Sequence, residues 1–347
     1  MIDGRFFPYS VNVEITLACN MRCLHCGSTA GRARSDELTG AEFGEIFRGL
    51  GELGCHEACL LGGEPFVRKD WYEEARSAVE ADIDVLFITN GYNMSRSILE
   101  KLGRLGRVDR IGVSIDGADA GVHDRIRGKA GSFERAWRAA CMVRDAGFET
   151  GIITTVSQIN LSELERMKDR IHKQDLTWQI QTAAPQGKRF DRSFILTPKQ
   201  FYELGRMIST WRSSIPVDDL PVCGSHDLGY FSRTLTRYGE LPAWSGCGAG
   251  LYTLGIMSDG RVKGCLSQHD DFIEASLRER GIEDIWNDGK LFARNRRFSV
   301  DMLEGHCKGC PHGDRCRAGC SNVSYNMTGS TYDNPYCFHR MERDGVA

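Results

Sequence analysis

The chain has 347 residues, of which 41% are hydrophobic and 26% charged, which is typical of a globular protein with one large and one smaller domain. Its 44 Lys and Arg against 47 Asp and Glu give a net charge of −3, which argues against nucleic-acid binding. No apolar run approaches the roughly 18 residues that span a bilayer, and residues 1–10 lack the apolar core of a secretory signal, so we expect a cytoplasmic protein without a membrane partner.

Residues 11–181 alternate short β-rich apolar runs with longer segments of helical spacing, which is the pattern of βα units around a parallel sheet. The expected strands are 11–17, 56–61, 84–89, 110–115, 150–156 and 177–181. The expected helices are 40–53, 71–81, 96–105, 133–146 and 162–173. Right-handed crossovers between such units predict an open or closed α/β barrel.

Three cysteines follow the first expected strand. Cys19, Cys23 and Cys26 form a CX3CX2C motif on a loop at the carboxyl end of that strand, where barrel active sites form. A 4Fe-4S cluster held by three thiolates keeps one iron free for a substrate or cofactor. The alternatives are a zinc site, which would need a fourth ligand such as His25, or three buried free thiols.

Polar and glycine motifs end the next three strands. They are Gly62, Gly63 and Glu64 after the second strand, Asn90 after the third, and Ser114 and Asp116 after the fourth. The glycines permit close backbone approach, and Glu64 can accept from an ammonium group. Ser114 and Asp116 stand two residues apart and therefore share one face. We expect these groups to converge beside the cysteine loop.

The βα pattern ends near residue 185. A helix at 198–211 leads into the Pro-containing stretch 215–222, so residues 196–246 are interpreted as a linker with a bridging helix. Segments 252–257 and 261–265 flank an Asp-Gly turn and predict a hairpin. The remaining chain is loop-rich and lacks the apolar residues for its own core, so bound metal is expected to stabilise it.

Half of the 14 cysteines lie in this last region. They are Cys247, Cys265, Cys307, Cys310, Cys316, Cys320 and Cys337. A long chain without an export signal favours metal ligation over disulfides. Two metal centres would use most of these thiols, and spacing alone does not separate structural zinc from iron-sulfur clusters. Cys55, Cys59 and Cys141 are interpreted as core residues.

Together these motifs resemble the radical S-adenosylmethionine (SAM) superfamily along the whole chain. The resemblance implies a partial (β/α)6 TIM-like barrel over residues 1–195 and a small C-terminal iron-sulfur SPASM domain over residues 247–347. It implies that Cys19, Cys23 and Cys26 hold a 4Fe-4S cluster whose free iron is chelated by SAM. The implied SAM contacts are Gly62, Gly63, Glu64, Asn90, Ser114 and Asp116, with Arg127 of an HDxxRG-like segment at the SAM carboxylate and His25 against adenine.

The resemblance to SPASM enzymes also assigns the rear cysteines to two auxiliary 4Fe-4S clusters, which makes three clusters in all. The proximal set would be Cys247, Cys265 and Cys320, and the distal set Cys307, Cys310, Cys316 and Cys337. The proximal set is one ligand short, so either one iron stays open or Cys223 supplies the fourth bond. Cys223 has two further interpretations, as a hydrogen-atom donor to a substrate radical or as an ordinary buried cysteine.

The function implied by the resemblance is reductive cleavage of SAM to a 5′-deoxyadenosyl radical that abstracts hydrogen from a substrate C–H bond. A ribosomally made peptide is the first substrate expectation, modified by crosslinking, epimerisation or oxidation. Because 18 residues precede Cys19, a separate leader-binding protein is expected, with a flavodoxin- or ferredoxin-type electron donor. Sulfatase maturation is disfavoured, because Leu266 follows Cys265 where those relatives place a catalytic Asp.

Two alternatives to a peptide-modifying enzyme remain. One is a dehydrogenase or epimerase of a sugar or aminocyclitol. The other is a non-enzymatic iron-sulfur electron carrier or redox sensor, which would need no SAM pocket.

Overall fold

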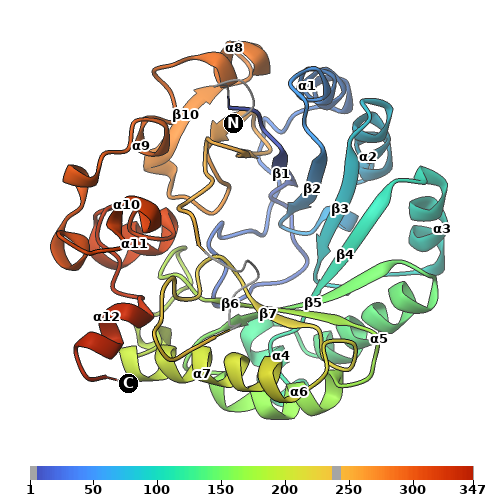
Figure 1. Ribbon diagram of the computed structural model, residues 1–347. Coiled ribbons are helices and arrows are strands. Elements are labelled where there is room, and N and C mark those ends of the chain that lie inside the picture. Colours follow the sequence, from blue (N-terminus) through green and yellow to red (C-terminus); the bar gives the residue numbers. More distant parts are fainter. Residues whose placement is uncertain (1–5, 237–243, 347) are drawn as a thin grey trace.

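A curved, largely parallel sheet organises the chain in the computed structural model, which describes residues 6–236 and 244–346 (Figure 1). Six strands lie side by side in chain order and run parallel. They are β1 (Ser10–Thr16), β2 (Glu57–Gly62), β3 (Asp84–Thr89), β4 (Val108–Ser114), β5 (Glu149–Val156) and β6 (Thr177–Thr182). All six expected strands are therefore confirmed, with ends within two residues of the predicted ones.

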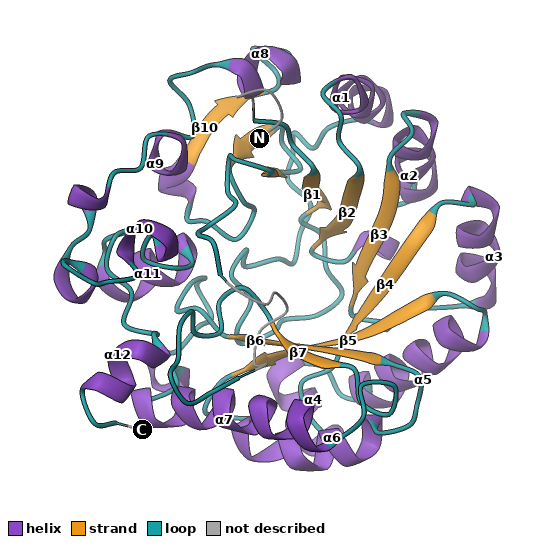
Figure 2. Ribbon diagram, in the orientation of Figure 1, coloured by secondary structure: helices purple, strands orange, loops and turns teal. Residues whose placement is uncertain are grey.

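Helices cover the outer face of this sheet (Figure 2). They are α1 (Gly40–Glu52), α2 (Trp71–Glu80), α3 (Arg96–Leu105), α5 (Ser132–Asp145), α6 (Leu164–Ile171) and α7 (Pro198–Ser214). The sequence analysis missed α4 (Ala120–Arg127), which is short and polar. The residues at its two ends could have indicated this helix. The Asp119 side chain accepts from the Gly121 N–H at 2.9 Å at the N-terminus, and Gly128 ends the helix in the left-handed region.

The C-terminal third of the chain continues the same sheet. Strand β8 (Thr253–Ile256) pairs parallel with β1, so that Val11 lies opposite Leu254. Strands β9 (Arg261–Lys263) and β10 (Ile273–Ser276) follow in antiparallel order, which confirms the hairpin predicted at the Asp-Gly turn. The sheet order in the described chain is β10-β9-β8-β1-β2-β3-β4-β5-β6-β7.

The segment predicted as a linker also contributes to the barrel. Strand β7 (Val222–Gly224) extends the sheet beyond β6, with Cys223 opposite Gln179. Helix α7 packs beneath it, and Trp211 stacks on Trp178 of β6 with ring centroids 5.4 Å apart. Residues 237–243 of that segment lie outside the described residues. The described part of this segment thus adds one strand and one helix to the barrel.

Short helices separated by loops make up the rest of the C-terminal region. They are α8 (Ile282–Asn287), α9 (Ala293–Arg296), α10 (Gly313–Cys316), α11 (Ser321–Thr328) and α12 (Phe338–Arg343). Their apolar residues join the barrel's two hydrophobic clusters, one containing Trp286 and the other Val323 and Phe338. The expectation that this region has no core of its own is therefore confirmed.

No helix in the described residues is long and apolar enough to cross a bilayer.

One aromatic side chain fastens the last helix to the barrel. Phe338 of α12 is fully buried, with its ring centroid 5.1 Å from that of Phe201 and 5.8 Å from that of Tyr202, both on α7. Gly229 provides the space, since a Cβ there would lie 2.0 Å from the Phe338 ring. The docking of α12, and of Cys337 just before it, depends on this contact.

Replacing Phe338 with Ala should lower the free energy of unfolding by about 3–5 kcal/mol, because a buried ring is lost and its cavity cannot collapse fully. Phe338→Leu should cost less. Val217→Ala is the matched control, since Val217 is 67% exposed and its truncation should change little. Anaerobic urea unfolding of the three variants measures this, and equal midpoints for Phe338→Ala and Val217→Ala would contradict it.

Candidate functional site

The loop between β1 and α1 carries Cys19, Cys23 and Cys26 and is fixed from two sides. On one side its backbone pairs with the end of α4, where the Leu24 N–H donates to Ile126 O at 2.9 Å. On the other side Arg189, from the segment after β6, donates to Cys23 O at 3.0 Å and to Ala30 O at 3.1 Å. The sequence analysis missed Arg189, because no motif surrounds it. The loop is held by contacts from widely separated parts of the chain.

Each of the three sulfurs faces an N–H donor. Cys19 Sγ accepts from Met21 N at 3.4 Å and lies 3.9 Å from Asn90 Nδ2. Cys23 Sγ lies 3.8 Å from Arg127 Nη1, and Cys26 Sγ accepts from the Ala30 N–H at 3.3 Å. Such donors stabilise thiolates and tune the metal centres that thiolates hold. Two predicted residues, Asn90 and Arg127, therefore do lie against the cysteine loop.

Burial opposes ionisation of two of these thiols, those of Cys19 and Cys23. It raises the pKa of Cys19 to about 11 and also raises the pKa of Cys23, although Arg127 counteracts it there. Without a cationic centre these groups stay protonated near neutral pH. Within residues 6–236 and 244–346, no three His, Cys, Asp or Glu side chains are grouped so as to hold a single metal ion.

Asp116 joins the groups around the loop into one buried network. Its carboxylate accepts from His25 Nε2 at 2.8 Å, from Arg127 Nη2 at 2.7 Å and from Thr155 N at 2.9 Å. Burial alone would favour the neutral acid, but Arg127 and His25 outweigh it and hold the pKa of Asp116 well below its usual range. Asp116 thus orients His25 and Arg127 from within the protein interior.

His123 is hydrogen-bonded to the backbone of Asp116. From the sequence it had no expected role beyond membership of the HDxxRG-like segment. Its Nδ1 accepts from the Asp116 N–H at 3.1 Å. Burial lowers the pKa of His123 to about 4, with Arg127 adding to the effect, so the ring is neutral at pH 7. A neutral acceptor of this kind fixes the backbone where β4 ends.

Glu64 connects the ends of β2 and β3. Its carboxylate accepts from Thr89 Oγ1 and Asn90 N, both at 2.7 Å, and from Phe66 N at 3.3 Å. Burial raises its pKa to about 7 despite these bonds. The carboxylate predicted to receive an ammonium group thus already binds three protein donors. A carboxylate offers about four lone-pair positions, so one remains.

The two glycines before Glu64 are required by close backbone packing. A Cβ at Gly62 would lie 2.2 Å from Thr16 O, and one at Gly63 would lie 2.1 Å from Ala18 O. Thr16 is the last residue of β1 and Ala18 directly precedes Cys19, so both contacts lie where the chain enters the cysteine loop. Ser114 lies half-buried at the end of β4. The predicted strand-end residues therefore gather at one edge of the sheet, and several of them bind one another.

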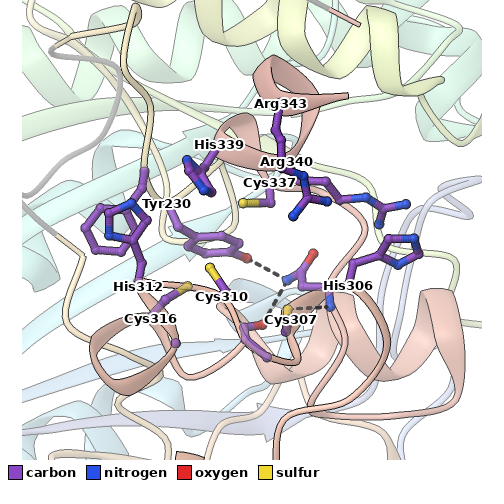
Figure 3. Close-up of a pocket in the computed structure, with 14 residues that line it drawn as sticks. Tyr230, His306, Cys307, Cys310, His312, Cys316, Cys337, His339, Arg340 and Arg343 are labelled. Carbon is purple, nitrogen blue, oxygen red and sulfur yellow. Dashed lines mark hydrogen bonds between the residues drawn. The ribbon is translucent and has the colours of Figure 1, made fainter. Parts of the chain in front are cut away.

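The four cysteines of the predicted distal set line one pocket (Figure 3). Cys307, Cys310, Cys316 and Cys337 come from the loops and short helices of the C-terminal region. The Asn334 N–H donates to Cys307 Sγ at 3.4 Å. The other lining side chains include three histidines, His306, His312 and His339, and two arginines, Arg340 and Arg343, whose guanidinium charges suit an anionic cluster.

In the predicted proximal set, Cys247 and Cys320 are buried and Cys265 is half-buried, and Cys320 directly precedes α11. Burial raises the pKa of Cys265 and, to about 12, that of Cys320, whose electrostatic neighbours include Cys247. Burial opposes ionisation of Cys247 too, but Arg294 and a 3.4 Å hydrogen bond with Ser321 Oγ outweigh it and lower its pKa.

Cys223 is the candidate fourth ligand of the predicted proximal set. Cys223 is half-buried on β7. His226, which no sequence motif indicated, favours ionisation of Cys265.

Of the cysteines interpreted as core, Cys55 is buried, whereas Cys59 and Cys141 are half-buried. That interpretation was therefore right for one of the three.

Comparison with known proteins agrees with this geometry. Residues 13–171 match the radical SAM superfamily, and residues 247–311 match the SPASM iron-sulfur cluster-binding domain. The chain is 29% identical to the AdoMet-dependent heme synthase of Methanosarcina barkeri, over 96% of this chain and 97% of that protein. It is 31% identical to the mycofactocin maturase MftC of Mycolicibacterium smegmatis, over 94% of this chain and 81% of that protein.

A solved structure shares the fold. SuiB of Streptococcus suis bound to S-adenosylmethionine superposes with a TM-score of 0.76 at 17% identity, over 95% of this chain and 77% of that chain. The chain is a radical SAM enzyme: it belongs to the radical SAM superfamily and carries the SPASM domain, a combination whose cofactors are SAM and more than one 4Fe-4S cluster.

Proposed function

We propose that this enzyme removes a hydrogen atom from a C–H bond of a ribosomally made peptide, leading to a crosslink, an epimerised residue or an oxidised side chain. When bound, the three-cysteine cluster and SAM together supply a 5′-deoxyadenosyl radical, which is reactive enough for such a bond. The chain's task is to hold these groups, orient the substrate and exclude water.

The observation that carries the proposal is the cysteine loop with its donors. We assign Cys19, Cys23 and Cys26 as the ligands of the catalytic cluster, because each sulfur faces an N–H group. Two buried donors near the loop, Asn20 Nδ2 and Arg127 Nε, have no hydrogen-bond partner among the described residues. Buried donors are nearly always hydrogen-bonded to an acceptor. A carboxylate such as that of SAM would supply one at these two donors.

The SAM contacts then divide into two kinds. Arg127 can offer its remaining donor to a carboxylate while Asp116 holds its guanidinium in place. Gly62, Gly63, Glu64, Asn90 and Ser114 shape the neighbouring strand ends, and His25 presents a ring whose edge is fixed by Asp116. We assign all of them to the SAM pocket, Asp116 and Glu64 as the residues that position the others.

The rear cysteines are assigned as two auxiliary clusters. The distal one would use Cys307, Cys310, Cys316 and Cys337, which share a pocket. The proximal one would use Cys247, Cys265 and Cys320, with Cys223 as the candidate fourth ligand or hydrogen donor. On this proposal residues 1–195 form the catalytic barrel, 196–246 the bridge and 247–347 the auxiliary-cluster domain.

A peptide substrate is supported by the relatives. SuiB has also been solved with its precursor peptide SuiA, and a second relative is named a maturase. A separate leader-binding protein and a flavodoxin- or ferredoxin-type donor complete the proposal. A small-molecule substrate is the second candidate, because the heme synthase matches this chain almost from end to end. An electron carrier without SAM chemistry is disfavoured by family membership.

Removing the three front cysteines together, as Cys19→Ala, Cys23→Ala and Cys26→Ala, should abolish SAM cleavage under dithionite. About four irons per chain should be lost, since one 4Fe-4S cluster disappears while the others stay. Cys141→Ala is the matched control, because Cys141 lies half-buried on α5. Iron content and 5′-deoxyadenosine are measured. Normal cleavage by the triple variant would refute the assignment.

Arg127→Lys should lower the rate of SAM cleavage about 10- to 100-fold, because an ammonium cannot reproduce the fork that reaches both Asp116 and Cys23. The iron content should remain that of the wild type. Arg125→Lys on the same helix is the control. Single-turnover formation of 5′-deoxyadenosine separates the two variants, and equal rates would contradict the role of Arg127.

The substrate class can be tested directly. Reconstituted enzyme is incubated anaerobically with SAM and a reductant, once with a peptide encoded beside its gene and once with a porphyrin precursor of heme. We expect a mass change in the peptide that matches loss or relocation of hydrogen, with 5′-deoxyadenosine formed in proportion. Modification of the porphyrin alone would establish the small-molecule alternative.

A further inference from the structure

A buried hydrogen-bond chain runs from the backbone of Cys265 to the sulfur of Cys247 and passes beside Cys320. Gln268, which is 5% exposed, lies at its centre. Its Oε1 accepts from the Cys265 N–H at 3.0 Å, and its Nε2 lies 3.1 Å from Ser321 Oγ. Ser321 Oγ in turn lies 3.4 Å from Cys247 Sγ. Ser321 follows Cys320 directly, so the chain passes beside that cysteine as well.

The directions of these hydrogen bonds follow from the donor groups. A backbone N–H only donates, so the Gln268 side-chain oxygen must face Cys265 and its NH2 must face Ser321. The Ser321 hydroxyl oxygen therefore receives a hydrogen bond, and its own proton is free for Cys247. A metal-bound Cys247 is a thiolate and has no S–H proton to donate, so it can only accept a hydrogen bond from Ser321.

A second buried group fixes Gln268 itself. Lys263 of β9 is 3% exposed, and its Nζ donates to Gln268 O at 2.7 Å and to Asp270 Oδ1 at 2.7 Å. The turn that carries Gln268 is thus held by a strand of the main sheet. The backbone of Gln268 is therefore held in place, which positions its side-chain amide toward Ser321.

We propose that Gln268 and Ser321 are positioning residues that set the reduction potential of the proximal auxiliary cluster, through a hydrogen bond to the Cys247 sulfur. The inference rests on the proposed ligation by Cys247, Cys265 and Cys320. Reduction adds negative charge to a cluster, and a hydrogen bond to a ligand sulfur stabilises that charge, which raises the potential. The potential decides whether the cluster can take an electron from a substrate radical.

The experiment uses the full chain carrying Cys19→Ala, Cys23→Ala and Cys26→Ala, reconstituted anaerobically, so that the auxiliary clusters alone give spectra. Redox titration followed by electron paramagnetic resonance measures their potentials. Ser321→Ala should shift one auxiliary potential to a more negative value, leave the other unchanged and preserve the iron content. Ser321→Thr keeps the hydroxyl and should restore the original potential.

Ser324→Ala is the matched control. Ser324 is a fully buried serine on the same helix, but its hydroxyl donates to Ala318 O and Cys320 O rather than to a sulfur. A merely structural effect would appear in Ser324→Ala as well, whereas the proposed effect would not. An equal shift in both variants would overturn the proposal.

Gln268→Met provides a second variant should Ser321→Ala lose its cluster. Methionine has a similar length but lacks the amide that orients the hydroxyl, so a smaller shift in the same direction is expected. If both variants keep their clusters and the wild-type reduction potentials, the proposed effect of the hydrogen-bond chain is refuted, whereas the proposed cysteine ligation is not. The absence of any iron-sulfur spectrum from the starting chain would refute the proposed ligation together with that effect.

Discussion

The buried ion pair between Arg127 and Asp116 is the interaction on which the front of the molecule depends. Asp116 is fully buried and Arg127 is 7% exposed. Through it, the end of β4 is connected to α4, to His25 and to the Cys23 sulfur. Removing one partner of such a pair leaves an uncompensated buried charge, which costs about 3–5 kcal/mol. A pair this difficult to break holds the cysteine loop in a single geometry.

The barrel and the cysteine-rich region form one folded unit. β8 and β9 extend the edge of β1, and the apolar side chains of the short helices enter the same clusters as those of the barrel. The regions that carry the three cysteine sets are therefore connected by shared strands and shared hydrophobic clusters. Because protein interiors are close-packed, fixed distances follow between them. Such fixed spacing suits electron transfer from one centre to another.

The sequence predicted the parts of this molecule that local patterns determine. The six parallel strands and most of the helices follow from hydrophobic periodicity, and the grouping of the four distal cysteines follows from the resemblance to SPASM enzymes. The extension of the sheet by β7 and β8 could not be predicted, because three or four residues carry no clear periodicity and their pairing is set by distant strands. Arg189 and Gln268 were missed because no motif marks them and because the partners Cys23, Ala30 and Ser321 lie far from them in the sequence.

The pairing of β8 with β1 has a consequence for how the protein is made. Residues 10 and 253 must meet before this edge of the sheet is covered, so the edge stays open while most of the chain is synthesised. Long-range strand pairing of this kind is slow. The Cys19–Cys26 loop follows β1 directly, so this loop leaves a strand whose second neighbour, β8, can pair only after residues 253–256 have been made.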